Sequence, residues 1–237
     1  KTVLIQHAGN YHNRYIIECV KRYAGRFAAV IWVDVEKPDA LETLERLSKE
    51  EGVCGVRLHP TERSPGSDPL AIWRKAAELG LPVSCFPRSA EHIADPAFQQ
   101  LVAEIPNMTL ILEHLAGAYR PLSPPSVTAP YDWYKAALTL SRFPNTYIKF
   151  GGLGEFCIRP RPLEAQFTFD EVPPLMDLAY GAFGPERMMW GSDYPPVGGR
   201  EGYRNSLQGV LDLPLFKTQE EKDWAFGKTA SKAFKLN

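Results

Sequence analysis

The sequence predicts an α/β fold in which a parallel sheet closes into a (β/α)8 TIM barrel, and three observations support this fold class. Short β-rich segments alternate with segments of helical length along the 237 residues. No Gly-x-Gly-x-x-Gly follows any of these segments, which weighs against an open nucleotide-binding sheet. Nearly every predicted strand ends in polar side chains, which a closed barrel would gather on one face. The length suits a single domain over residues 1–237.

The predicted elements follow one another in alternation. Strands are expected at residues 2–6, 27–33, 53–58, 82–86 and 108–112, then at 146–150, and last from Met188 until Pro195 ends the pairing. Helices are expected at residues 13–24, 38–51, 69–79, from Asp95 onward, at 131–142 and at 170–183. Asp95-Pro96 has the pattern of a helix cap followed by a first-turn proline. Thr218-Gln219-Glu220-Glu221 has the pattern of a capping box.

Composition excludes two classes of partner. The net charge of −1 and the pI near 6.6 give no basic surface for nucleic acid. No apolar run approaches the length of a membrane span. The four scattered cysteines form no CxxC pair, which favours reduced thiols and a cytoplasmic location. The composition is compatible with a homo-oligomer.

The strand count is one short of a complete barrel. Seven strands are predicted, and the chain opens at Lys1 without a methionine and reaches a strand at once. We therefore expect strand one to be absent from these 237 residues, so that residues 2–6 correspond to strand two.

Asp193 is the main candidate for a catalytic residue. It follows the apolar run Met188-Met189-Trp190, so it lies at the carboxyl end of a predicted buried strand, where an ionised carboxylate is costly without a role or a partner. The alternative is a turn aspartate that bonds its own backbone. His114 follows the strand at 108–112 in the same way, and its alternative is a hydrogen-bonded structural histidine.

Other polar residues at strand ends are candidates for binding substrate. Arginine suits bidentate capture of a carboxylate, so several basic residues at one face indicate an acidic small-molecule substrate. Each of these cations can instead be paired on the rim, and Glu113 can orient a neighbour. The candidate substrate-binding residues are Arg57, Lys149, Gln6, Arg88 and His59.

Three segments carry a resemblance to a known family. They are Ile111-Leu112-Glu113-His114-Leu115-Ala116-Gly117, Tyr147-Ile148-Lys149-Phe150-Gly151-Gly152 and Trp190-Gly191-Ser192-Asp193-Tyr194-Pro195. In this order they resemble the amidohydrolase-related ("amidohydrolase 2") TIM-barrel hydrolases, metal-dependent enzymes that include lactonases and aminocarboxymuconate-semialdehyde-type decarboxylases.

The resemblance implies a site and a cofactor. The family has a His-x-His pair after strand one, a histidine after strand six and an aspartate after strand eight. His114 and Asp193 match the last two, whereas the His-x-His pair has no counterpart in these residues. The resemblance therefore implies one divalent metal ion, zinc or manganese, on His114 and Asp193 if the absent strand supplies further ligands. A metal-free reaction is the alternative.

We expect a hydrolase of a cyclic ester (lactone) that bears a carboxylate. Asp193 would be the general base, and His114 would polarise the carbonyl or bind the metal. A metal-dependent non-oxidative decarboxylase on the same barrel is one alternative. A barrel that binds a small acid without turnover is the other.

Overall fold

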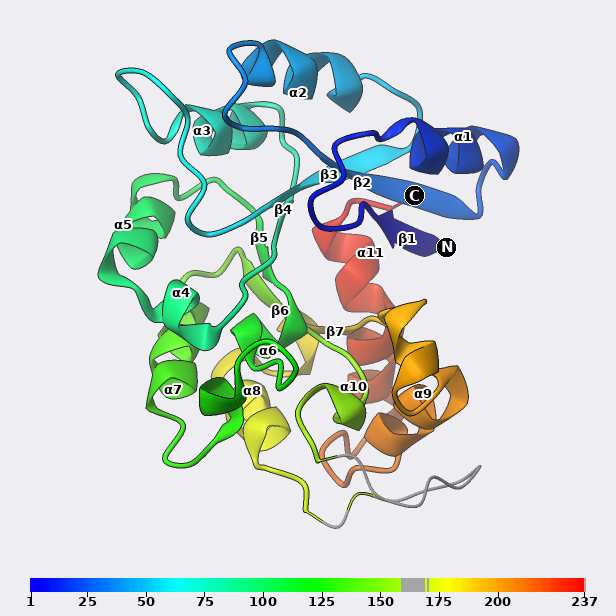
Figure 1. The fold of residues 1–237 in the computed structure, drawn as a ribbon. Helices are drawn as coiled ribbons and strands as arrows, with labels where there is room; N and C mark the ends of the chain where they lie inside the picture. The colour runs from blue at the N-terminus through cyan, green and yellow to red at the C-terminus, as the bar shows by residue number, and fades with distance from the viewer. Residues whose placement is uncertain (159–168, 170, 237) are drawn as a thin grey trace.

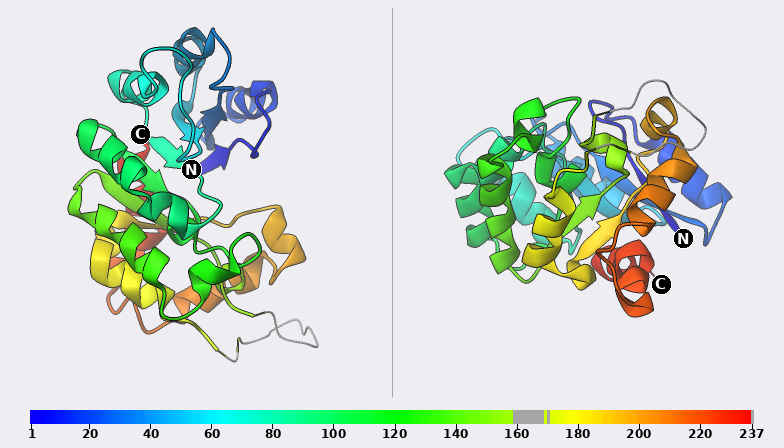
Figure 2. Two further views of the ribbon diagram at one scale, coloured as in Figure 1. Left: turned by 60° about the vertical axis from the view of Figure 1, so that its left-hand side comes forward. Right: turned by 90° about the horizontal axis from the view of Figure 1, so that it is seen from below.

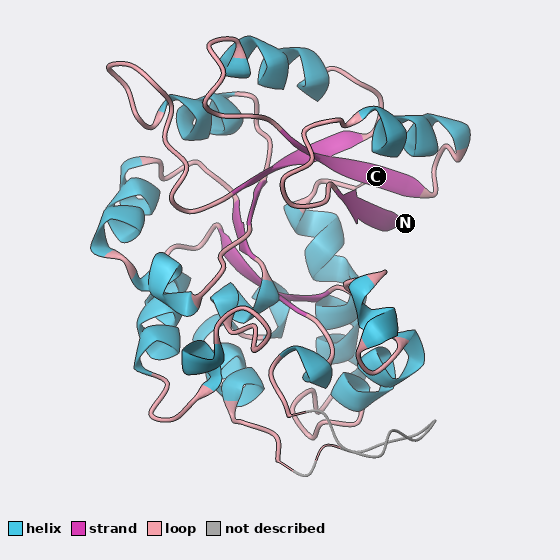
Figure 3. Ribbon diagram, viewed as in Figure 1, coloured by secondary structure: helices cyan, strands magenta, loops and turns pink. Residues whose placement is uncertain are grey.

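The structure, a computed structural model, describes residues 1–158, 169 and 171–236 (Figure 1). Its centre is a seven-stranded parallel sheet in which the strands pair in chain order. The sheet curls, and helices lie around its outer side (Figure 3). Neighbouring parallel strands need a crossover between them, and helices supply most of these crossovers, which explains the alternation in the sequence. The predicted parallel α/β fold is confirmed as a curled sheet of half-barrel form, with β1 and β7 at its two edges.

The strands are β1 (Thr2–Ile5), β2 (Phe27–Trp32), β3 (Val53–Leu58), β4 (Val83–Cys85), β5 (Leu110–Leu112), β6 (Thr146–Phe150) and β7 (Met188–Trp190). Two of them, β3 and β6, have the predicted bounds. The other five are shorter than predicted. β1, β2 and β7 end earlier, β5 begins two residues later, and β4 is shorter by one residue at each end. Asp193 is thus three residues beyond the last paired residue of β7.

The helices are α1 (Arg14–Arg22), α2 (Ala40–Ser48), α3 (Ala71–Glu78), α4 (Ala90–Ala94), α5 (Pro96–Glu104), α6 (His114–Gly117), α7 (Asp132–Leu138), α8 (Leu175–Phe183), α9 (Tyr203–Leu211), α10 (Gln219–Asp223) and α11 (Thr229–Ala233). The sequence did not predict α4. Asp95 caps α5 by accepting from the amide of Ala97, and Thr218 and Glu221 form the predicted capping box. The predicted start of a helix at Asp170 lies outside the described residues, and α8 begins at Leu175.

Two groups of apolar side chains hold the sheet. The larger lies between the sheet and the outer helices and includes the fully buried Trp73, Phe98 and Tyr134. The smaller joins Val30 and Met189 of the sheet to Phe234, which follows α11. Figure 2 shows α9, α10 and α11 together beside β7, and a π-helical stretch, Trp224–Lys228, joins α10 to α11. The C-terminal helices therefore support the β7 side of the sheet.

The carboxyl ends of all seven strands lie at the same end of the sheet, because the strands are parallel and in order. We call this end the mouth of the half-barrel. Among the described residues, no helix combines the length and the apolar character that crossing a membrane requires.

Candidate active site

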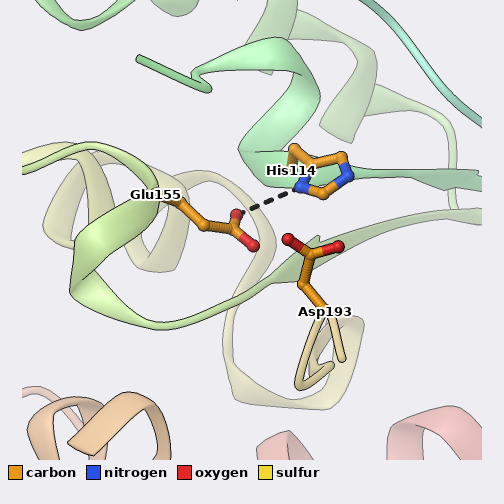
Figure 4. Close-up of side chains that lie close together, drawn as sticks. All are labelled: His114, Glu155 and Asp193. Carbon is orange, nitrogen blue, oxygen red and sulfur yellow. Dashed lines mark ion pairs between the residues drawn. The ribbon is translucent and has the colours of Figure 1, made fainter. Parts of the chain in front are cut away.

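Three loops at the mouth bring a histidine and two carboxylates together. His114 follows β5, Glu155 ends the 3-10 helix Leu153–Glu155 after β6, and Asp193 follows β7. One ligand atom from each of the three lies within 4.8 Å of the others. Figure 4 shows the carboxylates of Glu155 and Asp193 directed toward the space beside the imidazole. His114 and Glu155 are buried, whereas the Asp193 side chain is 23% exposed.

Backbone conformation aims two of these side chains. His114 and Asp193 have φ of 49° and 51°, in the left-handed region. Leu115 and Ala116 continue the left-handed turn after His114, at φ of 48° and 54°. Histidine and aspartate are among the residues enriched there, although each non-glycine residue in this region still costs energy. The strain falls on the loops that carry the candidate catalytic side chains, as is common at functional sites.

The ion pairs of the site centre on Arg200, which follows the 3-10 helix Pro196–Gly199. Its Nη1 donates to Asp193 Oδ2 at 2.6 Å, its Nε donates to Glu201 Oε2 at 3.2 Å, and its Nη2 lies 3.8 Å from Glu155 Oε1. Burial lowers the pKa of Arg200, but the charges of Glu155, Glu201 and Asp193 outweigh burial and raise it. The ring of Tyr119 packs against that of His114, with ring centroids 4.8 Å apart. The hydroxyl of Tyr119 accepts a hydrogen bond from Arg200 Nη1 at 3.3 Å.

A second buried network lies next to the first and centres on Glu113. Arg57 donates from Nε and Nη2 to Glu113 Oε2, and Lys149 donates to Oε1 at 3.0 Å. Ser84 also donates to Oε1, and Arg57 Nη1 donates to the carbonyl of Gln6 at 2.9 Å. Burial raises the pKa of Glu113, but Arg57 and Lys149 hold it well below its ordinary value. The structure therefore places two of the predicted substrate-binding cations on one internal carboxylate, against which they carry one surplus positive charge.

The remaining predicted binding residues lie elsewhere at the strand ends. The Gln6 side chain accepts from the amide of His7 and donates to the carbonyl of His12. His59 lies beside His92, with ring centroids 5.2 Å apart, and burial with the nearby positive charges lowers its pKa to about 4. His59 is therefore neutral at physiological pH. Arg88 is exposed, and no ion pair within the described chain involves it.

Sequence reasoning missed Glu155, Arg200 and Glu201. The glycines after β6 carried a signal for the two carboxylates, whereas no sequence signal pointed to Arg200. A Cβ at Gly151 would lie 2.0 Å from Glu155 Oε1, and a Cβ at Gly152 would lie 2.2 Å from Glu201 Oε1. The Gly-Gly-Leu-Gly run is thus the cradle of two buried carboxylates, a close approach that only glycine permits.

The site has an acidic surplus, because three carboxylates surround one guanidinium. Glu155 Oε2 is buried, has no hydrogen-bond partner and lies 3.3 Å from His114 Nδ1. An imidazole nitrogen with carboxylate oxygens is a donor set that zinc and manganese accept. His114, Glu155 and Asp193 therefore form a candidate metal site, in which Glu155 is a third ligand that the sequence did not predict.

The family of the chain follows from comparison with known proteins. The profile of the family described as Amidohydrolase matches residues 2–236, so this chain belongs to that family. The curled parallel sheet agrees with that membership, which the three sequence segments predicted.

Two characterised relatives act on lactones. The chain is 24% identical over 204 residues to the L-fucono-1,5-lactonase of Burkholderia ambifaria, a match that covers 82% of this chain and 64% of the relative. It is 26% identical over 196 residues to the 4-sulfomuconolactone hydrolase of Hydrogenophaga intermedia, covering 78% of this chain and 57% of the relative. The chain thus spans less than two thirds of the length of either protein.

A solved structure supports the fold. The amidohydrolase from Burkholderia multivorans, determined with bound zinc, matches with a TM-score of 0.75 at 21% identity. The match covers 99% of this chain and 83% of that one.

Proposed function

We propose that this protein hydrolyses a carboxylated lactone at the mouth of the half-barrel. The observation that carries the proposal is the convergence of His114, Glu155 and Asp193 within 4.8 Å. The lactone-hydrolysing relatives support ring opening as the reaction. The curled sheet would then represent seven of the eight strands of a (β/α)8 barrel, with the eighth position between β7 and β1.

Asp193 is proposed as the general base that takes a proton from water, and His114 as the group that polarises the carbonyl. The left-handed backbone at both residues holds these side chains toward the same space. If a divalent ion is bound, His114, Glu155 and Asp193 would hold it, and it would supply Lewis acidity and a more acidic bound water.

The substrate carboxylate is proposed from the network around Glu113, in which cations outnumber carboxylates. Arg57 and Lys149 together face one carboxylate, Glu113, and Arg88 is exposed at the end of β4. Gln6 and His59 would contribute neutral hydrogen-bonding groups. We further propose a cytoplasmic location, which the four free cysteines support. A homo-oligomer is compatible with this proposal.

The test is a substrate panel. A sugar 1,5-lactone, a muconolactone and a pyrone dicarboxylate would be supplied to the purified chain, and acid release would be followed with a pH indicator in weak buffer. Ring opening with a preference for carboxylated members supports the proposal. Release of CO2 from a hydroxybenzoate without ring opening would favour the decarboxylase instead. Calorimetric binding of the panel without turnover would favour the small-acid-binding barrel.

A further inference from the structure

Buried polar atoms without a protein partner gather at one place in the described part of the chain. The described residues contain six such side-chain atoms, and four of the six lie around Arg200. These four, which we call the Arg200 cluster, are Arg200 Nη2, Glu155 Oε2, Glu201 Oε1 and Ser206 Oγ. Buried polar groups are normally hydrogen-bonded, so a concentration of unpaired ones marks a place where a polar ligand can bind.

The donors of Arg200 divide into two sets. Nε and Nη1 are committed to Glu201, Asp193 and Tyr119. Nη2 carries two N–H groups, and its nearest charged partner, Glu155 Oε1, is 3.8 Å away, beyond hydrogen-bonding distance. The committed donors fix the plane of the guanidinium, and the free nitrogen lies among the residues proposed for catalysis. A fixed, pre-aimed donor of this kind is what stabilises charge that develops in a transition state.

We propose that Arg200 is a catalytic residue whose Nη2 binds the carbonyl oxygen of the lactone as that oxygen becomes an oxyanion. This inference rests on the proposed lactone hydrolysis. It gives the reaction a cation from the chain itself, next to the base, with or without a metal at His114, Glu155 and Asp193.

The reaction balances around these groups. Water adds to the carbonyl carbon while Asp193 Oδ1, the oxygen that Arg200 does not contact, takes its proton. The π electron pair moves to the carbonyl oxygen, and Nη2 of Arg200 donates to the oxyanion. When that pair returns, the ring C–O bond breaks, and the proton on Asp193 passes to the leaving alkoxide. One lactone and one water thus give one hydroxy acid.

The experiment compares two ligands in Arg200→Met and the unaltered chain. One is a cyclic phosphonate, which imitates the tetrahedral oxyanion, and the other is the cyclic ether of the same ring, which has no carbonyl oxygen. We expect Arg200→Met to weaken phosphonate binding and to lower kcat by about a hundredfold each, as for loss of an oxyanion donor, while ether binding changes little. Arg204→Met removes the same charge from an exposed position four residues along, and both ligands should then bind as before.

A structural role for Arg200 would weaken both ligands equally, and that result would overturn the inference. Retention of phosphonate affinity by Arg200→Met in a chain that opens lactones would also overturn it and leave the proposed function intact. If the unaltered chain neither opens a lactone nor binds the phosphonate, both proposals fail.

Removal of Arg200 leaves buried carboxylates uncompensated, so Arg200→Lys provides a second variant if Arg200→Met does not fold. A lysine keeps the charge, but its single nitrogen cannot hold Asp193 and the oxyanion together. We expect it to fold and to lose at least about tenfold in kcat. Unchanged kcat in Arg200→Lys would contradict the role of Nη2.

Discussion

Lys149 Nζ lies 3.0 Å from Oε1 of Glu113, on the opposite side of the carboxylate from Arg57, which binds Oε2. One fully buried acid thus holds two cations from β3 and β6 in place. Buried charges of this kind are costly when a partner is lost, because the remaining charges are left without compensation.

Glu113→Gln should therefore destabilise the fold by about 3–5 kcal/mol, measured as the free energy of unfolding in urea. Glu104→Gln is the matched control, since Glu104 pairs with Arg74 at an exposed position and should matter by less than about 1 kcal/mol. The pKa of Glu113 is lowered on folding, so its contribution is present above the ordinary glutamate pKa and lost as the pH falls below it. Equal stabilities of the two variants would show that the network carries no net charge coupling.

Asp193→Asn should lower kcat for lactone opening by at least about a hundredfold, because the amide keeps the size but loses the basicity. Its thermal unfolding and its substrate binding should remain close to those of the unaltered chain. Asp212→Asn, at an exposed position after α9, is the control and should leave kcat unchanged. Near-normal turnover by Asp193→Asn would make Asp193 only a turn residue that pairs with Arg200.

Two neighbouring groups should give opposing pH dependences of stability. Burial raises the pKa of Glu62 to about 7, and the charges of Asp34 and Glu36 add to the rise. Folding therefore favours the protonated form of Glu62, and its contribution to the free energy of unfolding falls as the pH rises from about 4.5 to 7. Burial lowers the pKa of His59 to about 4. The contribution of His59 to the free energy of unfolding therefore rises as the pH rises from about 4 to 6.5. The two terms oppose each other over the shared range.

Glu62→Gln removes only the contribution of Glu62, which falls as the pH rises. Relative to the unaltered chain, the variant should gain roughly 2 kcal/mol of stability between pH 4.5 and pH 7.5, allowing for partial solvent screening. Urea unfolding across this pH range measures the gain, with Glu186→Gln as an exposed control. Parallel profiles for Glu62→Gln and the unaltered chain would contradict the raised pKa.

Two glycine substitutions should have opposite signs. A Cβ at Gly152 would lie 2.2 Å from Glu201 Oε1 and 2.7 Å from the Cα of Ser206, so Gly152→Ala should cost about 1–3 kcal/mol. Gly181, within α8, has no atom within 4 Å of the added Cβ, so Gly181→Ala should stabilise by up to about 1 kcal/mol. Urea unfolding of both variants decides the matter, and a neutral Gly152→Ala would mean that Glu201 can shift without loss.

Metal binding can be measured directly. We expect zinc or manganese to bind the purified chain in calorimetric titration, and Glu155→Gln to weaken that binding by at least about tenfold. Glu186→Gln serves again as the control. If Glu155→Gln binds the ion as tightly as the unaltered chain does, Glu155 is not a ligand and the acidic surplus has another role.

The sequence predicted the parallel α/β fold, because strand and helix periodicities are local signals and the strand ends carried polar residues such as His114 and Lys149. It also predicted that Asp193 would follow the last strand. It could not predict the partners of these groups. That Arg57 binds Glu113 depends on the stagger between β3 and β5, which no local pattern encodes. The sequence did not indicate that Arg200 lies at the site, because Arg200 follows a proline-glycine loop and reaches the site only through tertiary packing.

The left-handed backbone at His114 and Asp193 also bears on how this site can change during evolution. At both positions the main chain disfavours β-branched residues whatever the chemistry requires, and it favours histidine, aspartate, asparagine and glycine. Single substitutions that preserve the loops therefore exchange an acid, an imidazole and an amide for one another or remove the side chain. The mouth can drift between different hydrolytic and binding roles through such exchanges while its architecture stays the same.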